Sequence, residues 1–221
     1  MKAAVVTFPG SNCDRDLAVG FERAGFEVVR VWHKDTALPS GTDVVGVPGG
    51  FSFGDYLRCG AIAARSPVAA AVVAHAGRGG VVLGVCNGFQ VLTEMRLLPG
   101  ALMRNAQLKF LCKVANLTVC SDSPFTSGYA PGQRIDLPIA HHDGNYTIDS
   151  EGLARLQGEG LVAFRYTENL NGSVDRIAGV MSDNRRILGL MPHPERAVDA
   201  THGGTDGVAL FAGLMGGMAL A

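Results

Sequence analysis

The 221-residue sequence has no excess of charge of either sign, because 19 Lys and Arg stand against 20 Asp and Glu. Without a basic run it offers no electrostatic footprint for nucleic acid or for an anionic membrane surface. It also lacks long apolar runs: the stretch 69–76 is far shorter than the roughly 20 residues that a membrane-spanning helix needs. Near the N-terminus, Pro9-Gly10 interrupts the apolar segment 3–8 before it reaches the length of a signal sequence. We therefore expect a protein that binds neither nucleic acid nor membrane.

The sequence is also poor in cysteine patterns and nucleotide-binding motifs. Its five cysteines are odd in number and include no C-x-x-C pair, which fits neither a disulfide framework nor a common zinc site. No G-x-x-x-x-G-K-[ST] motif occurs, and no G-x-G-x-x-G follows a predicted strand. We expect a cytoplasmic protein with no metal site and no recognisable device for holding nucleotide phosphates.

Apolar segments rich in valine alternate with helical patterns in the first half of the chain. Such segments predict strands over 3–8, 27–32, 43–47, 81–85 and, late in the chain, 187–191. Helices are predicted over 14–24, 57–65, 68–75, 89–95 and 207–220. A strand–helix–strand beginning with a helical crossover indicates a parallel sheet with right-handed connections. The predicted fold class is α/β, a flavodoxin-like, largely parallel central sheet with helices on both faces.

The pattern changes after Leu98-Pro99-Gly100, where β-branched segments and turns replace helices. Strands are predicted over 108–112, 114–119, 135–140, 161–166 and 175–182. No internal repeat or low-complexity linker separates this part from the rest. We interpret it as an antiparallel β elaboration on the same sheet, and the whole chain, 1–221, as a single domain.

The strongest local signal is Gly84-Val85-Cys86-Asn87-Gly88, a G-x-C-x-G sequence between the strand 81–85 and a helix. This is the cysteine version of the nucleophile elbow, in which flanking glycines permit a tight, strained turn that exposes the nucleophile. A thiol at a helix N-terminus lies at the positive end of the helix dipole, which favours the thiolate. The alternative is a small buried cysteine that ends a core strand. The flanking glycines favour the nucleophile.

His193 and Glu195 follow the strand 187–191. Pro192 precedes His193, and Pro194 lies between His193 and Glu195, so both prolines restrict the backbone of this segment. A cysteine nucleophile needs a base, and the base needs a partner that fixes its tautomer. Because the carboxyl ends of parallel strands meet at one edge of the sheet, Cys86, His193 and Glu195 are expected to meet there. The alternative for the last two is a rigid surface loop with a histidine–carboxylate hydrogen bond. Together with the cysteine elbow, they predict a catalytic triad.

The segment Pro48-Gly49-Gly50-Phe51 ends a neighbouring strand and can place a backbone N–H, that of Gly50, close to a ligand. The N–H of Asn87 is the expected second donor of an oxyanion hole, although a plain Pro-Gly turn is the alternative for residues 48–51. Gln90 lies one helical turn beyond Cys86 and could hold a polar substrate.

Other polar residues give weaker signals. His141 and His142 are adjacent and point apart in an extended chain, so a metal site there is not expected. The remaining cysteines are interpreted as small core or near-surface residues rather than ligands: Cys13, Cys59, Cys112 and Cys120. Arg58 and Arg104-Asn105 are functional or simply solvated, and their spacing does not decide between these.

These motifs together resemble the class I (triad) glutamine amidotransferases. Within that class the chain is similar to the glutaminase subunits of phosphoribosylformylglycinamidine synthases. The specific matches are the segments 9–14, 49–63, 98–100, 171–173 and 191–198. The resemblance implies that Phe51, Gln90, His142 and Asp143 contact the substrate glutamine. At 141–145 this chain has His-His-Asp-Gly-Asn where the family usually has His-Gly-Glu-Gly-Asn. In related amidotransferases this segment lines the glutamine pocket, so the departure concerns the substrate contacts and not the triad.

The resemblance implies hydrolysis of glutamine through a Cys86 thioester, with the ammonia passed to a partner. The partners would be a large synthetase subunit and a small bridging subunit, and ATP and Mg²⁺ would bind to the synthetase, with no cofactor in this chain. The complex would convert formylglycinamide ribonucleotide to formylglycinamidine ribonucleotide in purine biosynthesis. The isolated chain would be a weak glutaminase, because partner contact completes its pocket.

Three other functions share parts of this pattern. A triad amidotransferase for another acceptor would share Cys86, His193 and Glu195 but lack the 49–63 segment. A non-catalytic, regulatory amidotransferase-like subunit would have a broken triad, whereas this one is intact. A general cysteine hydrolase on a related sheet is favoured less, because Pro-His-Pro-Glu after a late strand is typical of amidotransferases.

Overall fold

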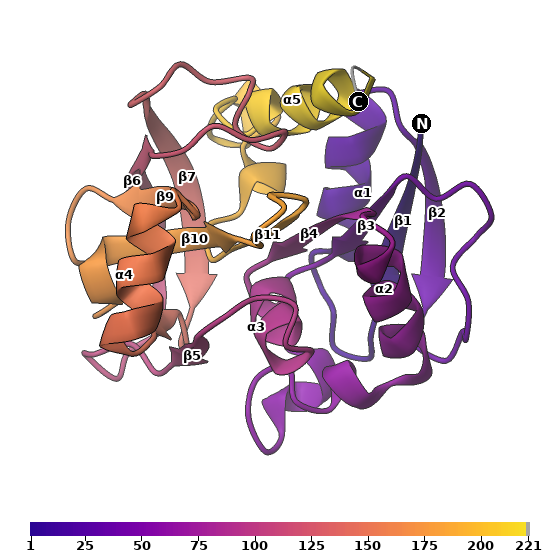
Figure 1. The fold of residues 1–221 in the computed structure, drawn as a ribbon, viewed down its shortest axis with the longest axis horizontal. Coiled ribbons are helices and arrows are strands. Elements are labelled where there is room, and N and C mark those ends of the chain that lie inside the picture. Colours follow the sequence, from indigo (N-terminus) through magenta and orange to yellow (C-terminus); the bar gives the residue numbers. More distant parts are fainter. Residues whose placement is uncertain (220–221) are drawn as a thin grey trace.

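The computed structural model describes residues 1–219 and contains one nine-stranded sheet with helices packed against it (Figure 1). The strand order is β2-β1-β3-β4-β11-β10-β9-β6-β7. The strands that form its first five positions are β1 (Lys2–Thr7), β2 (Glu27–Trp32), β3 (Val44–Val47), β4 (Val81–Val85) and β11 (Ile187–Leu190). The helices are α1 (Asp14–Arg23), α2 (Pro67–Gly77), α3 (Asn87–Glu94), α4 (Ser150–Gly158) and α5 (Val208–Ala219).

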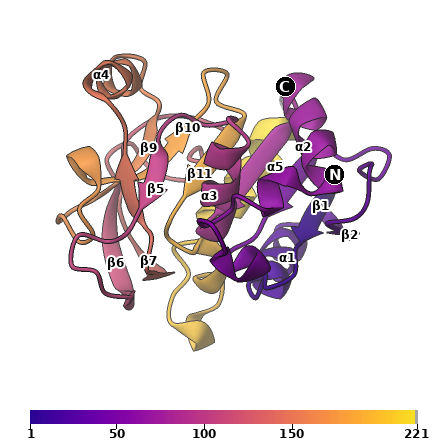
Figure 2. The ribbon, with the colours of Figure 1, turned by 90° about the horizontal axis from the view of Figure 1, so that it is seen from below.

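The first five strands of the sheet are parallel to one another, from β2 at the edge to β11. Every residue of β3, β4 and β11 is buried, which explains why these segments read as continuous apolar runs. Helix α1 packs against β1 and α5, whereas α2 and α3 pack against β4; α1 and α2 lie on opposite sides of β1 (Figure 2). The predicted flavodoxin-like, largely parallel α/β sheet is confirmed.

The remaining four strands are antiparallel and extend the same sheet beyond β11. They are β10 (Ile177–Met181), β9 (Val162–Tyr166), β6 (Leu111–Val119) and β7 (Arg134–His141). Two short strands, β5 (Ala101–Met103) and β8 (Asn145–Thr147), form a separate two-stranded sheet. The antiparallel elaboration is confirmed. Its pairing with the parallel half supports the single domain over 1–221, which stays a prediction.

The predicted helix over 57–65 is wrong. The segment consists of turns, with a 3₁₀ turn at Ser52–Asp55 before it and another at Ala63–Arg65. Asp55 and Leu57 have left-handed backbone angles, with φ of 55° and 70°, which no α-helix of L-residues contains. Gly60 lies so close to α3 that an added Cβ would be 2.7 Å from the Val91 nitrogen. Tertiary packing against α3 has replaced the local helical preference.

Other strand and helix boundaries differ from the predicted ones because of local backbone features. The strands predicted over 108–112 and 114–119 are one strand, β6, which begins after Leu108 adopts a left-handed φ of 54°. β10 starts at Ile177 rather than at Asp175, because residues 174–176 form a 3₁₀ turn. Helix α4 was not predicted, although Asp149 caps it by accepting a hydrogen bond from the Gly152 N–H at 2.7 Å. The predicted end of the last helix, Leu220, lies outside the described residues.

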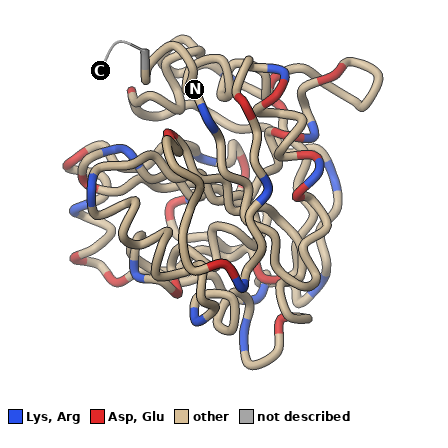
Figure 3. The backbone as a smooth tube through the Cα atoms, turned by 90° about the vertical axis from the view of Figure 1, so that its right-hand side faces the viewer, with Lys and Arg blue, Asp and Glu red and all other residues tan. Residues whose placement is uncertain are grey.

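The distribution of charged residues and the length of the apolar helices are visible in the structure. On the side shown in Figure 3, Lys and Arg alternate with Asp and Glu along the backbone, with no extended field of one sign. Within residues 1–219, no helix is both long enough and apolar enough to cross a membrane.

Candidate active site

Cys86 lies at the turn between β4 and α3, directly at the carboxyl edge of the parallel strands. Its φ of 50° and ψ of −106° are strained for a residue with a side chain. The turn depends on its glycines, since a Cβ on Gly88 would lie 1.9 Å from the Val47 carbonyl oxygen. A Cβ on Gly84 would lie 2.6 Å from Leu92. The strained turn between glycines that was expected of an elbow is present.

His193 and Glu195 follow β11 at the same edge of the sheet. The His193 Nδ1 and Glu195 Oε1 atoms are 2.7 Å apart, and both side chains are almost completely buried, at 2% and 3% exposure. The backbone N–H of His193 donates to the Pro138 carbonyl at 2.8 Å, which connects the segment after β11 to β7. With Nδ1–H donating to the carboxylate, Nε2 of the neutral ring keeps a free lone pair. Among the described residues this Nε2 atom has no hydrogen-bond partner.

The side chains of Cys86 and His193 converge on Gly49, which follows β3. A Cβ added to Gly49 would lie 2.8 Å from His193 Cε1 and 3.4 Å from Cys86 Cβ. It would also lie 3.2 Å from the Sγ of Cys13. The structure thus brings together the three predicted triad residues, with Glu195 on the far side of the imidazole from its free nitrogen.

The electrostatic environment keeps His193 available as a proton carrier. Burial alone would lower the pKa of His193, but the Glu195 carboxylate and the Cys86 thiolate outweigh burial and raise it well above its usual value. Neighbouring His141 is also buried. Burial and the charge of His193 lower the pKa of His141 to about 4, so this second ring stays neutral.

Two backbone N–H groups are free near Cys86. Within residues 1–219, the N–H groups of Gly50 and Asn87 donate no hydrogen bond. Asn87 is the first residue of α3, where N–H groups have no intrahelical acceptor. Gly50 has a φ of 143°, and any Cβ there would lie 2.8 Å from backbone atoms of Gly10, Ser11 and Asn12. Both groups are available to donate to a ligand oxygen, and their role as oxyanion donors stays a prediction.

Polar side chains line the region on the α3 side of Cys86. The Gln90 Nε2 donates to the Asp143 carbonyl at 2.7 Å, and Asn87 Nδ2 donates to Gln90 Oε1 at 2.8 Å. Asn87 Nδ2 is also 3.3 Å from Asp55 Oδ1. Burial raises the pKa of Asp55. The network holds the Gln90 side chain between Asn87 and the Asp143 carbonyl, and its contact with a polar substrate stays a prediction.

The other predicted glutamine contacts lie at the rim of this region. Phe51 is about half exposed. His142 Nδ1 lies 3.0 Å from Asp143 Oδ2, and Arg104 Nε lies 3.8 Å from Asp143 Oδ1. His142 and Asp143 therefore pair with each other, and their contacts with glutamine stay a prediction.

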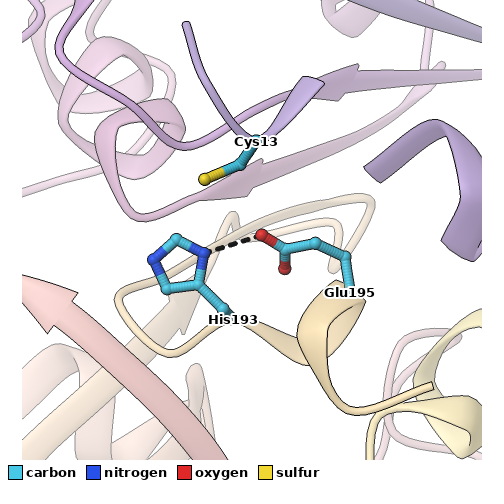
Figure 4. Close-up of side chains that lie close together, drawn as sticks. All are labelled: Cys13, His193 and Glu195. Carbon is cyan, nitrogen blue, oxygen red and sulfur yellow. Dashed lines mark hydrogen bonds and ion pairs between the residues drawn. The ribbon is translucent and has the colours of Figure 1, made fainter. Parts of the chain in front are cut away.

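Sequence reasoning missed two residues of this region. Cys13, interpreted as a core or near-surface cysteine, faces the imidazole of His193 (Figure 4). Asn105 is fully buried, and its Oδ1 lies 3.0 Å from His141 Nδ1 and accepts from the Gly144 N–H at 3.1 Å. The available signal for Cys13 was its place in the segment 9–14, one of the segments that carried the family resemblance. Asn105 was left undecided between a functional and a solvated residue, and its complete burial excludes the solvated alternative.

We expect Gly49→Ala to lower kcat/KM for glutamine hydrolysis by about 10²-fold, because displacing a catalytic group by about 1 Å can cost that much. The added methyl would meet His193 Cε1 at 2.8 Å and push the imidazole away from Cys86. Gly77→Ala is the matched control, since a Cβ at Gly77 in α2 would meet no atom within 4 Å. Steady-state kinetics with both variants, together with thermal melts, check this. Equal activity of the two variants would contradict it.

The comparisons with known proteins agree with this geometry. Residues 1–205 match the model of a CobB/CobQ-like glutamine amidotransferase domain. The chain is 72% identical to a phosphoribosylformylglycinamidine synthase subunit PurQ of Cereibacter sphaeroides, with 100% of both chains covered. It belongs to the PurQ family of glutamine amidotransferases. A PurQ subunit of Zymomonas mobilis is 57% identical, with 99% of this chain and 100% of the relative covered.

Solved structures of glutamine amidotransferases have a similar fold. The PurLQS structure from Thermotoga maritima contains a chain that is 44% identical, with a TM-score of 0.90 and 98% of each chain covered. A glutamine amidotransferase structure from the same organism has a TM-score of 0.68 at 13% identity, covering 100% of this chain and 99% of the other. The second likeness shows the fold alone. The PurQ family membership agrees with the family resemblance in the sequence.

Proposed function

We propose that this chain is the glutaminase subunit of a phosphoribosylformylglycinamidine synthase. It hydrolyses glutamine and supplies ammonia for the ATP-dependent conversion of formylglycinamide ribonucleotide to formylglycinamidine ribonucleotide. The observation that carries the catalytic part is the convergence of Cys86 and His193 on Gly49, with Glu195 hydrogen-bonded to the imidazole. The PurQ relatives support the synthase part.

The reaction begins when the Cys86 thiolate attacks the side-chain carbonyl carbon of glutamine. The N–H groups of Gly50 and Asn87 stabilise the negative oxygen of the tetrahedral intermediate. The protonated His193 gives its proton to the leaving nitrogen, so that ammonia departs and a γ-glutamyl thioester remains on Cys86. His193 then takes a proton from water, the resulting hydroxide attacks the thioester, and glutamate is released. Glu195 holds the imidazole in the required orientation throughout.

The ATP-dependent half of the synthase reaction belongs to other subunits in this proposal. The chain carries no recognisable phosphate-binding motif, so ATP and Mg²⁺ bind to a large synthetase subunit, and a small bridging subunit completes the complex. The relative from Thermotoga maritima comes from a structure titled PurLQS. The five free cysteines support a reducing, cytoplasmic setting.

The loop 51–60 offers a surface for the synthetase subunit next to the active site. Tyr56 and Leu57 expose 74% and 91% of their surface, which is costly for apolar side chains in a free chain. Phe53, Asp55 and Leu57 all have left-handed backbone angles. Such strain persists where a specific conformation serves function. Because Gly60 of this loop contacts Gln90 and Val91 in α3, a partner bound to the loop can influence Cys86 through that helix.

The test is glutamate release by the purified chain, measured alone and with the two partner subunits, formylglycinamide ribonucleotide and ATP. We expect weak activity alone and strong stimulation by the complete mixture. Leu57→Asp should raise the partner concentration needed for half-maximal stimulation by about 10-fold, which corresponds to about 1.4 kcal/mol of binding free energy.

Val73→Asp is the matched control, because Val73 is an exposed valine on α2, outside the loop. If glutaminase activity does not respond to the partners, glutamine hydrolysis remains supported, but the role in formylglycinamidine ribonucleotide synthesis is excluded. Full activity of the isolated chain would contradict completion of the pocket by partner contact.

A further inference from the structure

The side chain of Asn87 forms a buried hydrogen-bond network that the reaction above does not use. That reaction needs only the backbone N–H of this residue, yet Asn87 is 1% exposed and its side-chain amide has three partners. The Oδ1 atom accepts from the Ser52 backbone N–H at 3.1 Å, and Nδ2 donates to Gln90 Oε1 at 2.8 Å and lies 3.3 Å from Asp55 Oδ1. Because a backbone N–H can only donate, the Ser52 contact fixes which end of the amide is the oxygen.

Two of these three partners belong to the loop 51–60. Ser52 is buried, and Asp55 is half-buried and directly precedes the exposed side chains of Tyr56 and Leu57. The end of the loop that faces solvent is therefore one residue away from a hydrogen bond to the elbow. Asn87 itself is too deeply buried to contact a partner subunit, so any effect of the partner on it must pass through the loop.

The same loop follows directly after the other expected oxyanion donor. Gly50 lies two residues before Ser52, and the Ser52 N–H is bonded to the side chain of Asn87. The backbone N–H groups of Gly50 and Asn87 therefore belong to two segments that this bond holds together. Oxyanion donors act over a narrow range of distances, and a displacement of about 1 Å can cost about 10²-fold in rate. The position of the loop thus affects the spacing of both donors.

The loop is held in a conformation that is costly for its residues. Phe53, Asp55 and Leu57 have left-handed φ angles of 53°, 55° and 70°, although none of them is glycine. The Ser52 hydroxyl is buried and has no hydrogen-bond partner within residues 1–219. Both features favour a second arrangement of the loop, since strain and an unpaired buried hydroxyl are relieved when the backbone moves. A partner that binds one arrangement more tightly than the other shifts the balance between them.

We propose that the Asn87 side chain is a positioning group that transmits the conformation of the loop 51–60 to the two oxyanion donors. A partner bound at Tyr56 and Leu57 holds Asp55 and Ser52 against the Asn87 amide, which fixes the Asn87 N–H relative to that of Gly50. Stimulation of the glutaminase then needs no contact between the partner and Cys86. This inference rests on the proposed function, because it explains how the partner stimulates the reaction.

The test is the rate of glutamate release by Asn87→Ala, which keeps the backbone N–H and removes the amide. With saturating partner subunits, formylglycinamide ribonucleotide and ATP, we expect kcat to fall about 10-fold, because the donors stabilise mainly the transition state. The partner concentration for half-maximal stimulation should stay within about 2-fold of the native value, since Asn87 does not reach the surface. Circular dichroism verifies that each variant folds.

Asp55→Ala separates the loop contact from the contact with Gln90, which it leaves in place. We expect it to lower kcat about 10-fold with little change in KM, and Asp55→Asn to restore most of the rate because its amide oxygen can still accept from Asn87. The double variant Asp55→Ala/Asn87→Ala should be no slower than Asn87→Ala, as expected for two groups that act through one contact. Asp122→Ala is the control, because Asp122 is an exposed residue in the turn after β6.

Three results would overturn the proposal: native kcat in folded Asn87→Ala, a loss confined to KM, or additive effects in the double variant. If the partners do not stimulate even the native chain, the proposed function fails instead. The same three variants then decide the positioning role from kcat of the chain alone, where a double variant no slower than Asn87→Ala supports it and additive losses exclude it. Failure of the inference and failure of the proposed function are therefore distinguishable.

Discussion

Replacing Cys86 with alanine is expected to reduce glutamate release by about 10⁵-fold or more, since the variant has no nucleophile to form the thioester. The fold should survive, because the substitution removes only a sulfur atom whose one hydrogen bond, to the Ala140 carbonyl, is long at 3.7 Å. Glutamate release by the purified variant, measured with and without partner subunits, checks the result.

Two controls make the Cys86→Ala result specific. Cys112→Ala removes an exposed thiol on β6 and should leave glutamate release as it is in the native chain. In the complex, Cys86→Ala should still support product formation when ammonium salt replaces glutamine, because the acceptor half of the reaction lies in the partner. Glutamate release at the native rate would mean that Cys86 is not the nucleophile.

Glu195→Gln is expected to lower kcat/KM by about 10³-fold, because an amide can donate to His193 Nδ1 and stabilise the tautomer that cannot accept a proton at Nε2. The variant also removes the charge that keeps the pKa of His193 high against burial. His193 then loses its proton at a lower pH. The decline of kcat/KM on the alkaline side should therefore begin at lower pH than in the native chain.

The measurement for Glu195→Gln is the pH profile of kcat/KM in the presence of partners. Glu159→Gln is the matched control, since Glu159 is an exposed residue at the end of α4, where it pairs with Arg155. The control should keep both the rate and the profile of the native chain. A full loss of rate in Glu195→Gln with an unmoved alkaline limb would contradict the electrostatic role of the carboxylate.

Local sequence was sufficient to predict the parallel half of the fold and the elbow. Continuous valine-rich runs such as Val81–Val85 are buried on both faces, and only strands covered by helices on both sides accommodate them. The glycines at 84 and 88 signalled a turn at which backbone and side-chain atoms approach to distances that a Cβ would not permit. Each of these signals depends on residues close together in the chain.

The segment 57–65 shows where such local reasoning fails. Its residues have a helical pattern, but Gly60 packs onto α3, and Arg58 forms an ion pair with Glu94 in that helix. Contacts between segments some 30 residues apart outweighed the modest local preference for a helix. The same applies to the short strands β5 and β8, which pair across more than 40 residues.

The sequence by itself determined the α/β class, the cysteine elbow and the His193–Glu195 pair, because each is encoded by neighbouring residues whose types constrain the local backbone. Only the tertiary structure decided which side chains share the active-site interior. Cys13 and His193 are 180 positions apart, and their meeting at Gly49 depends on how the ends of three parallel strands align. Packing of distant segments therefore placed the Cys13 thiol beside the His193 imidazole, a contact that no local pattern encodes.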